Sequence, residues 1–246
     1  MSKVAIAGKG GVGKTTVSAL IIRALVENKK NPILAVDADP NSNLYLSLGA
    51  NFSQTIADIR DEVRREVPPG FSRSDYFKLK LEGIISENKY FDLLVMGRPE
   101  GAGCYCSVNN LLREFLSKLS KNYPYVIMDC EAGLEHLSRR TSDNLDYLIL
   151  VTEPNIASLR AVEKALEIAK KIPLKIKQKY LLINKIKNKE IDKLRGHLDN
   201  LKIPVLAELP YEEKFIFASE EGKNIFEIEI PPNIKDIFYK LIEKIS

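Results

Sequence analysis

The residues with the clearest chemical potential run from position 8 to position 16 and read GKGGVGKTT. Gly8, Gly13, Lys14 and Thr15 fit the spacing of a phosphate-binding loop. In such a loop the backbone N–H groups turn inward around the β- and γ-phosphates of a nucleotide, Lys14 adds a positive charge, and the Thr15 hydroxyl suits Mg²⁺. We therefore expect every residue of the loop to contact the nucleotide: Gly8, Lys9, Gly10, Gly11, Val12, Gly13, Lys14, Thr15 and Thr16.

Three aspartates form a second candidate group, because they follow two apolar, β-branched runs. Asp37 and Asp39 belong to the segment VDADPN, and Asp129 belongs to MDCEAG. One aspartate after a strand often does no more than cap a helix. Three of them, at the strand ends where α/β proteins bind ligands, make a shared functional site the better interpretation.

Cys104 and Cys106 lie one residue apart in GCYCSVNNLLR and could bind a metal ion. Ser107 is placed to cap a helix that starts near Val108, and a thiol near a helix N-terminus favours the thiolate that metal binding needs. Two cysteines supply two ligands, so a closed four-thiolate site needs two copies of the chain. Nickel and zinc both accept such a site, and the alternative is a pair of ordinary buried cysteines.

A parallel sheet would bring these residues together. Runs of continuous rather than alternating apolarity predict strands buried on both faces, at residues 4–7, 33–36, 93–96, 126–128, 148–151, 180–183 and 205–209. Helical patterns separate most of them, at residues 12–28, 108–119, 134–142, 156–171 and 189–201. The alternation predicts an α/β class, a single-domain P-loop fold over residues 1–246 with a mostly parallel sheet of about seven strands sandwiched between helices.

The composition bounds the partners. The 246 residues are 45% hydrophobic with a net charge of +4, which suits a soluble domain and is too mild to predict a nucleic-acid partner. No stretch approaches the roughly 18 apolar residues of a membrane span and no signal peptide is recognisable, so we expect a cytoplasmic protein without a membrane partner. Nine lysines from Lys170 to Lys193 are interpreted as a solvated face rather than a track for a phosphate backbone.

Two segments are less regular. Residues 51–90 include DEVRREVPPG, which predicts a helix broken at Pro68 and Pro69 and could hold an insertion or a partner-binding element. The last predicted helix, at residues 233–245, carries an apolar stripe that could lie on a membrane. Its polar face mixes acidic residues with lysines, which favours packing on the sheet.

The segments KGGVGKTT, VDADPN and MDCEAG together resemble the deviant Walker A ATPases, the family that includes MinD, ParA, the nitrogenase iron protein and metal-insertion ATPases. The resemblance implies a nucleotide-dependent homodimer in which Lys9 reaches the phosphates bound by the other subunit, as an arginine finger does. It also implies that Asp39 orients the attacking water, that Asp37 lies near Mg²⁺, that Asp129 binds Mg²⁺ through water, and that Gly133 lies near the γ-phosphate.

The same resemblance places an adenine-contacting asparagine at Asn184 and a proline that walls the purine at Pro210. The alternative for Asn184 is a residue that closes a turn. The residues after Asn184 do not complete a guanine-binding motif, so ATP is preferred to GTP. The implied reaction is hydrolysis of ATP to ADP and phosphate, with Lys9, Lys14 and Asp39 as catalytic residues.

Within this family, GCYCSVNNLLR and DCEAGLEHLSRR resemble the CooC-type ATPases, which mature carbon monoxide dehydrogenase by nickel insertion. The resemblance implies that Cys104 and Cys106 bind Ni²⁺, or Zn²⁺ in its place, across the dimer. It also implies a client enzyme of the carbon monoxide dehydrogenase or acetyl-CoA synthase type. Glu131 replaces a proline usual in MinD and ParA. We expect Cys130 to be packed in the core and His136 to lie at the surface.

Two other functions stay open at this point. A positioning or partitioning ATPase like MinD or ParA would bind DNA through the lysine-rich segment or lipid through the last helix. An iron–sulfur reductase like the nitrogenase iron protein would pair Cys130 with Cys104 or Cys106. Metal delivery is the leading hypothesis because Lys9 and the two closely spaced cysteines occur in one chain.

Overall fold

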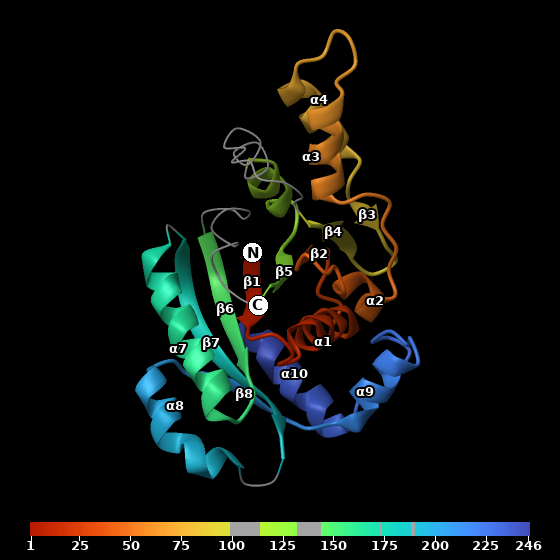
Figure 1. Cartoon of the computed structure of the whole chain (residues 1–246). Helices are drawn as coiled ribbons and strands as arrows, with labels where there is room; N and C mark the ends of the chain where they lie inside the picture. The colour runs from red at the N-terminus through yellow and green to blue at the C-terminus, as the bar shows by residue number, and fades with distance from the viewer. Residues whose placement is uncertain (99–113, 132–143, 173, 188–189) are drawn as a thin grey trace.

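The computed structural model describes residues 1–98, 114–131, 144–172, 174–187 and 190–246. A central sheet runs through the molecule, and helices cover both of its faces (Figure 1). This arrangement is the predicted α/β fold, and the strand and helix ranges agree closely with those expected from the apolar patterns.

Eight strands form the sheet within the described residues, in the order β3-β4-β2-β5-β1-β6-β7-β8. Seven of them are parallel and coincide with the seven predicted apolar runs: β1 (Ser2–Gly8), β2 (Ile33–Ala38), β4 (Asp92–Val95), β5 (Tyr125–Cys130), β6 (Asn144–Thr152), β7 (Lys175–Ile186) and β8 (Val205–Pro210). The eighth, β3 (Ser86–Glu87), pairs antiparallel with β4 at one edge. All six residues of β2 are buried, as continuous apolarity predicts for a strand covered on both faces.

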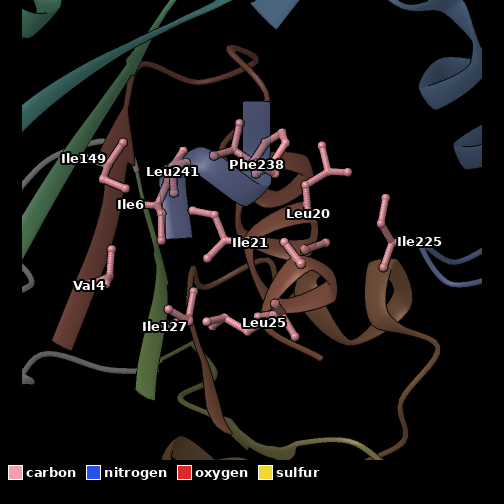
Figure 2. Packing of buried hydrophobic residues seen from close by; sticks show 14 of the residues in the cluster. Val4, Ile6, Leu20, Ile21, Leu25, Ile127, Ile149, Ile225, Phe238 and Leu241 are labelled. Carbon is pink, nitrogen blue, oxygen red and sulfur yellow. The ribbon is translucent and has the colours of Figure 1, made fainter. Parts of the chain in front are cut away.

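One face of the sheet is covered by α1 (Lys14–Glu27) and α10 (Pro232–Lys244), with the short helices α2 (Leu44–Leu48) and α9 (Glu213–Glu220) beside them. Figure 2 shows Ile21 of α1 and Leu241 of α10 beside the strand residue Ile6, and Leu20 of α1 beside Phe238 of α10, all within one apolar cluster. The predicted stripe of the last helix therefore packs on the protein, and each of Ile234, Phe238, Leu241 and Ile242 is at most 2% exposed.

The opposite face is covered by α7 (Ile156–Lys171), η1 (Glu190–Leu194), α8 (Arg195–Leu201) and a helical segment at 114–120. α7 has the predicted bounds. The helix predicted at residues 189–201 is instead a 3₁₀ turn followed by α8. The start of the helix predicted at 108–119 and the whole helix predicted at 134–142 lie outside the described residues.

Residues 51–90 form two helices, α3 (Ile56–Arg65) and α4 (Arg73–Glu82), which project above β3 and β4 in Figure 1. The break between them contains Pro68 and Pro69, as predicted. A capping box begins α3, because the Thr55 hydroxyl accepts from the Asp58 N–H and the Asp58 carboxylate accepts from the Thr55 N–H.

The two ends of the chain meet beside the start of β1. The Ser2 hydroxyl donates a hydrogen bond to the backbone carbonyl of Ile245, just after α10. Among the described helices, none has both the length and the apolarity required to cross a bilayer.

Candidate functional site

The phosphate loop joins the carboxyl end of β1 to the first turn of α1, and close contacts with neighbouring strands fix its course. Gly8 has φ 153°, and a Cβ there would lie 2.3 Å from the carbonyl oxygen of Val151 in β6. Gly13 has φ 91°, and a Cβ there would lie 2.5 Å from Nδ2 of Asn184 in β7. Both positions require glycine, because any larger residue would push the loop away from the strand ends.

The N-terminus of α1 is arranged for an anion. Gly13 is the N-cap residue and has no side chain to cap the helix, which suits the first N–H groups of α1 to phosphate oxygens. Lys14 is 8% exposed, and its ammonium donates a long hydrogen bond of 3.4 Å to the carbonyl oxygen of Lys9. Thr16 is half-buried and Val12 is buried in the core, whereas Lys9, Gly10 and Gly11 are exposed.

A buried polar cluster lies at the base of this loop. Asp129, at the end of β5, is 1% exposed, and its Oδ2 accepts a 2.7 Å hydrogen bond from the Thr15 hydroxyl. Its Oδ1 is 3.2 Å from the Ser18 hydroxyl, which also lies 2.9 Å from the carbonyl oxygen of Lys14. Burial raises the pKa of Asp129 to about 6, against the opposing effects of the Thr15 hydrogen bond and the Lys14 charge.

Asp37 lies beside Asp129, because the two residues are in register on the adjacent strands β2 and β5. Its Oδ2 accepts from the Leu44 N–H at 2.9 Å and its Oδ1 from the Asp39 N–H at 3.3 Å. Asp37 therefore holds the start of α2 in place. Burial, with a further contribution from the charge of Asp129, raises the pKa of Asp37 to about 7.

The donor set fits Mg²⁺. Two carboxyl groups withdrawn from water and the Thr15 hydroxyl supply the hard oxygen atoms that this ion prefers, and its charge would compensate the buried carboxylates. Asp39 is half-buried at the same edge of the sheet, and its Oδ1 accepts from both the backbone and the side-chain N–H groups of Asn41, at 2.9 and 3.0 Å.

A pocket of about 300 Å³ adjoins the loop and contains both residues predicted to contact the base. Asn184, at the end of β7, and Pro210, at the end of β8, line it together with Gly11, Gly13 and Thr16. The Asn184 amide donates from Nδ2 to the carbonyl oxygen of Val12 at 2.8 Å. Because a carbonyl oxygen accepts only from the NH₂ end, this bond fixes the amide orientation and leaves Oδ1 as the acceptor available to a ligand.

The predicted metal-binding cysteines Cys104 and Cys106 lie outside the described residues, as do Gly133 and His136. Cys130 is 2% exposed in the core, and burial raises the pKa of its thiol, so it is packed as expected. Within the described ranges no group of three or more histidine, cysteine, aspartate or glutamate residues could hold a metal ion.

Ser18 is the residue of this cluster that the sequence motif does not include. It lies one helical turn after Thr15, on the same face of α1, and that spacing is the signal that could have identified it. Lys185 and Glu153, next to the phosphate loop at the ends of β7 and β6, also belong to this edge of the sheet and follow no recognisable motif.

Known proteins are similar to this chain in sequence and in fold. Residues 3–225 match the CobQ/CobB/MinD/ParA nucleotide-binding domain. An uncharacterised ATP-binding protein of Methanocaldococcus jannaschii is 40% identical, over 98% of both chains. The carbon monoxide dehydrogenase accessory protein CooC of Rhodospirillum rubrum is 30% identical, over 70% of this chain and 71% of its own. The structure of MinD from Pyrococcus horikoshii, complexed with Mg-ADP, has a TM-score of 0.71 and 26% identity, covering 100% of this chain and 96% of that chain. The chain therefore belongs to the CobQ/CobB/MinD/ParA family of P-loop ATPases.

Proposed function

We propose that this ATPase works as a nucleotide-dependent homodimer that delivers a metal ion, nickel or zinc in its place, to an enzyme of the carbon monoxide dehydrogenase or acetyl-CoA synthase type. The observation that carries the hydrolytic part is the buried cluster of Thr15, Ser18 and Asp129 directly below the phosphate loop. The delivery part is supported by the likeness to CooC and by the pair Cys104 and Cys106.

The side chains divide the hydrolytic work. The hydrogen bond from the Lys14 ammonium to the loop carbonyl is long, at 3.4 Å, so the ammonium can exchange that carbonyl for a phosphate oxygen. Asp39 accepts a hydrogen bond from the attacking water and so orients the lone pair of the water oxygen toward the γ-phosphate. Mg²⁺, when held by Thr15 and through water by Asp129, supplies positive charge to the β- and γ-phosphates.

Lys9 completes the site of a second subunit. Its side chain is exposed at the top of the loop, one residue after Gly8. A lysine supplied in trans neutralises the charge that develops on the transferred phosphoryl group, so that dimer assembly controls hydrolysis.

The fixed amide of Asn184 supports ATP as the substrate. Its Oδ1 accepts from the amino group of adenine, whereas guanine would place the acceptor O6 against the same oxygen. Pro210, on the opposite strand end of the pocket, supplies an apolar wall for the purine ring.

The dimer is tested by measuring the mass of the assembly with and without ATP and Mg²⁺. We expect Asp39→Ala to bind ATP, to hydrolyse it at least about 100-fold more slowly and to accumulate as a dimer. Lys9→Ala should lose about 1000-fold in hydrolysis rate. A wild-type protein that stays monomeric when saturated with ATP and Mg²⁺ would contradict the proposal.

The metal site is tested by elemental analysis of anaerobically purified protein. The double variant Cys104→Ser, Cys106→Ser should lose the metal ion shared by the dimer, whereas Cys130→Ala should retain it, because Cys130 is buried. Retention of one metal ion per dimer by the double variant would rule out delivery through these cysteines. A brown wild-type protein with visible absorption would instead indicate an iron–sulfur reductase.

A second candidate function is that of a positioning or partitioning ATPase. The likeness to the MinD structure, which covers the whole chain, favours it. This function requires ATP-dependent binding to DNA or to anionic lipid.

A further inference from the structure

Lys185 connects the phosphate loop to the neighbouring strand ends. Its ammonium donates to the carbonyl oxygen of Gly11 at 2.6 Å and to Oε1 of Glu153 at 2.8 Å. Glu153 directly follows β6, and its other carboxylate oxygen accepts from the side chain of Asn155, the N-cap residue of α7, at 3.3 Å. One cation therefore joins the top of the loop to β7, β6 and the start of α7.

The backbone of β7 is irregular where it presents this side chain. Lys185 has φ 60°, in the left-handed region that non-glycine residues rarely adopt. The pairing of β7 with β8 shifts in register between Ile183 and Ile186, the interval that contains Lys185. Such irregularities commonly aim a side chain away from the alternation of a regular strand. The backbone therefore adopts an unfavourable conformation that places the ammonium over the loop.

Among the residues that the structure describes, few pack against the top of the loop. Gly11 is exposed with φ 82°, and among the described residues nothing lies within 4 Å of the position that a Cβ would take. The side chains of Lys185 and Glu153 are 38% and 30% exposed, so solvent screens the ion pair and weakens its effect on overall stability. The hydrogen bond from Lys185 still holds the carbonyl group of Gly11 in position.

We propose that Lys185, held by Glu153, is a positioning residue that fixes the Gly11 carbonyl and so preorganises the phosphate loop for nucleotide. This inference rests on the nucleotide site proposed above and assigns no contact with the reacting phosphate. Fixing the loop before binding removes part of the entropy that binding would otherwise cost. Loss of the contact should therefore raise the dissociation constant for the nucleotide and leave the rate at saturation nearly unchanged.

The test compares four variants of the full chain by titration with ATP in the presence of Mg²⁺ and by steady-state hydrolysis. Lys185→Met removes the donors and should raise Kd and KM about tenfold, with kcat within about twofold of wild type. Glu153→Gln keeps an acceptor and should have a smaller effect. The double variant should be no weaker than Lys185→Met alone, because the two residues act as a unit.

The matched control is Lys202→Met, at another exposed lysine with a left-handed backbone, φ 53°, at the end of α8. It should bind ATP as the wild type does. Melting temperatures without nucleotide report folding, and a Lys185→Met protein that does not fold leaves Glu153→Gln to carry the comparison. An unchanged Kd in the folded variants, or a loss of kcat as large as the loss of affinity, overturns the inference. Failure of the wild type to bind ATP would instead overturn the nucleotide site itself.

Discussion

Asp37 and Asp129 hold two carboxyl groups out of water at adjacent strand ends, where the charge of Asp129 disfavours ionisation of Asp37. Hydrogen bonds from Leu44, Thr15 and Ser18 compensate only part of the lost hydration, because both pKa values stay above the ordinary range of aspartate. Burying ionised carboxylates without a cation costs free energy, and binding a cation compensates their charge. We therefore expect these two residues to make nucleotide binding depend on Mg²⁺ and stability depend on pH.

The free energy of unfolding without nucleotide or Mg²⁺ should depend on pH through these carboxyl groups. Their pKa values are raised to about 7 and about 6 in the folded protein, so the folded state binds more protons than the unfolded chain in this range. Their stabilising contribution is complete below the ordinary pKa of aspartate and is lost as the pH rises through these values. Urea titrations of wild type and Asp129→Asn at about pH 5 and about pH 8 measure the effect.

The expected result is that Asp129→Asn is more stable relative to wild type at the higher pH than at the lower. Mg-ADP should reduce the difference, because a bound cation favours the ionised carboxylate. If Asp129→Asn instead becomes less stable relative to wild type as the pH rises, the assignment is contradicted.

Thr15 and Ser18 contact the same carboxylate but should differ in function. Thr15→Val keeps the shape and removes the hydroxyl, so we expect hydrolysis to fall by about 100-fold or more. Ser18→Ala removes a hydrogen bond to Asp129 Oδ1 and should lower the free energy of unfolding by about 1 kcal/mol, with hydrolysis changed less than about tenfold. Steady-state rates and urea titrations separate the two effects, and equal losses of rate would contradict the distinction.

Residues within a motif could be predicted from the sequence, and residues that support the motif from elsewhere could not. The loop and Asp129 are fixed by spacing and by position after an apolar run. Lys185 contacts Gly11, and Glu153 contacts Lys185, only because β6 and β7 end beside β1, and no local pattern encodes that proximity. Asn184 and Pro210, the two residues predicted to contact the base, line one pocket because β7 and β8 are neighbouring strands.

At the level of elements, long apolar patterns were predictive and short elements were not. All seven parallel strands and α7 match their apolar runs, because burial on both faces or on one stripe leaves a periodic signal. α2, α9 and β3 have five, eight and two residues, too few to show a period. α2 begins where Asp37 accepts from the Leu44 N–H, so a side chain at the end of β2 stabilises its start.

The stripe of α10 should make a large contribution to stability. Phe238 is 2% exposed between α1 and the sheet, as Figure 2 shows, so Phe238→Ala should lower the free energy of unfolding by about 3–5 kcal/mol. Phe217→Ala on α9 is the matched control, because Phe217 is 55% exposed and should change stability by less than about 0.5 kcal/mol. Urea denaturation measures both, and similar values would show that α10 is loosely attached.

For the whole molecule, the packing of α10 bears on its partners. Its apolar stripe is buried, and Lys177 in the lysine-rich segment pairs with Asp146 at 2.6 Å. We therefore expect no ATP-dependent co-sedimentation with DNA or with anionic vesicles. Binding that requires ATP and falls steeply with salt would favour the positioning or partitioning function. Lys9→Ala, which lacks the lysine proposed to act across the dimer, is the control for binding that depends on the dimer.

The contact between Ser2 and Ile245 places both ends of the chain at the amino-terminal edge of the sheet, whereas the phosphate loop leaves β1 at the carboxyl-terminal edge. A short linker can therefore join residue 246 to residue 1, and new ends can be opened at exposed Gly70 between α3 and α4. Such a circular permutant leaves every strand-end residue of the nucleotide site in place. It should bind ATP as the parent does, and fluorescent labels at the original ends should report subunit association without obstructing it.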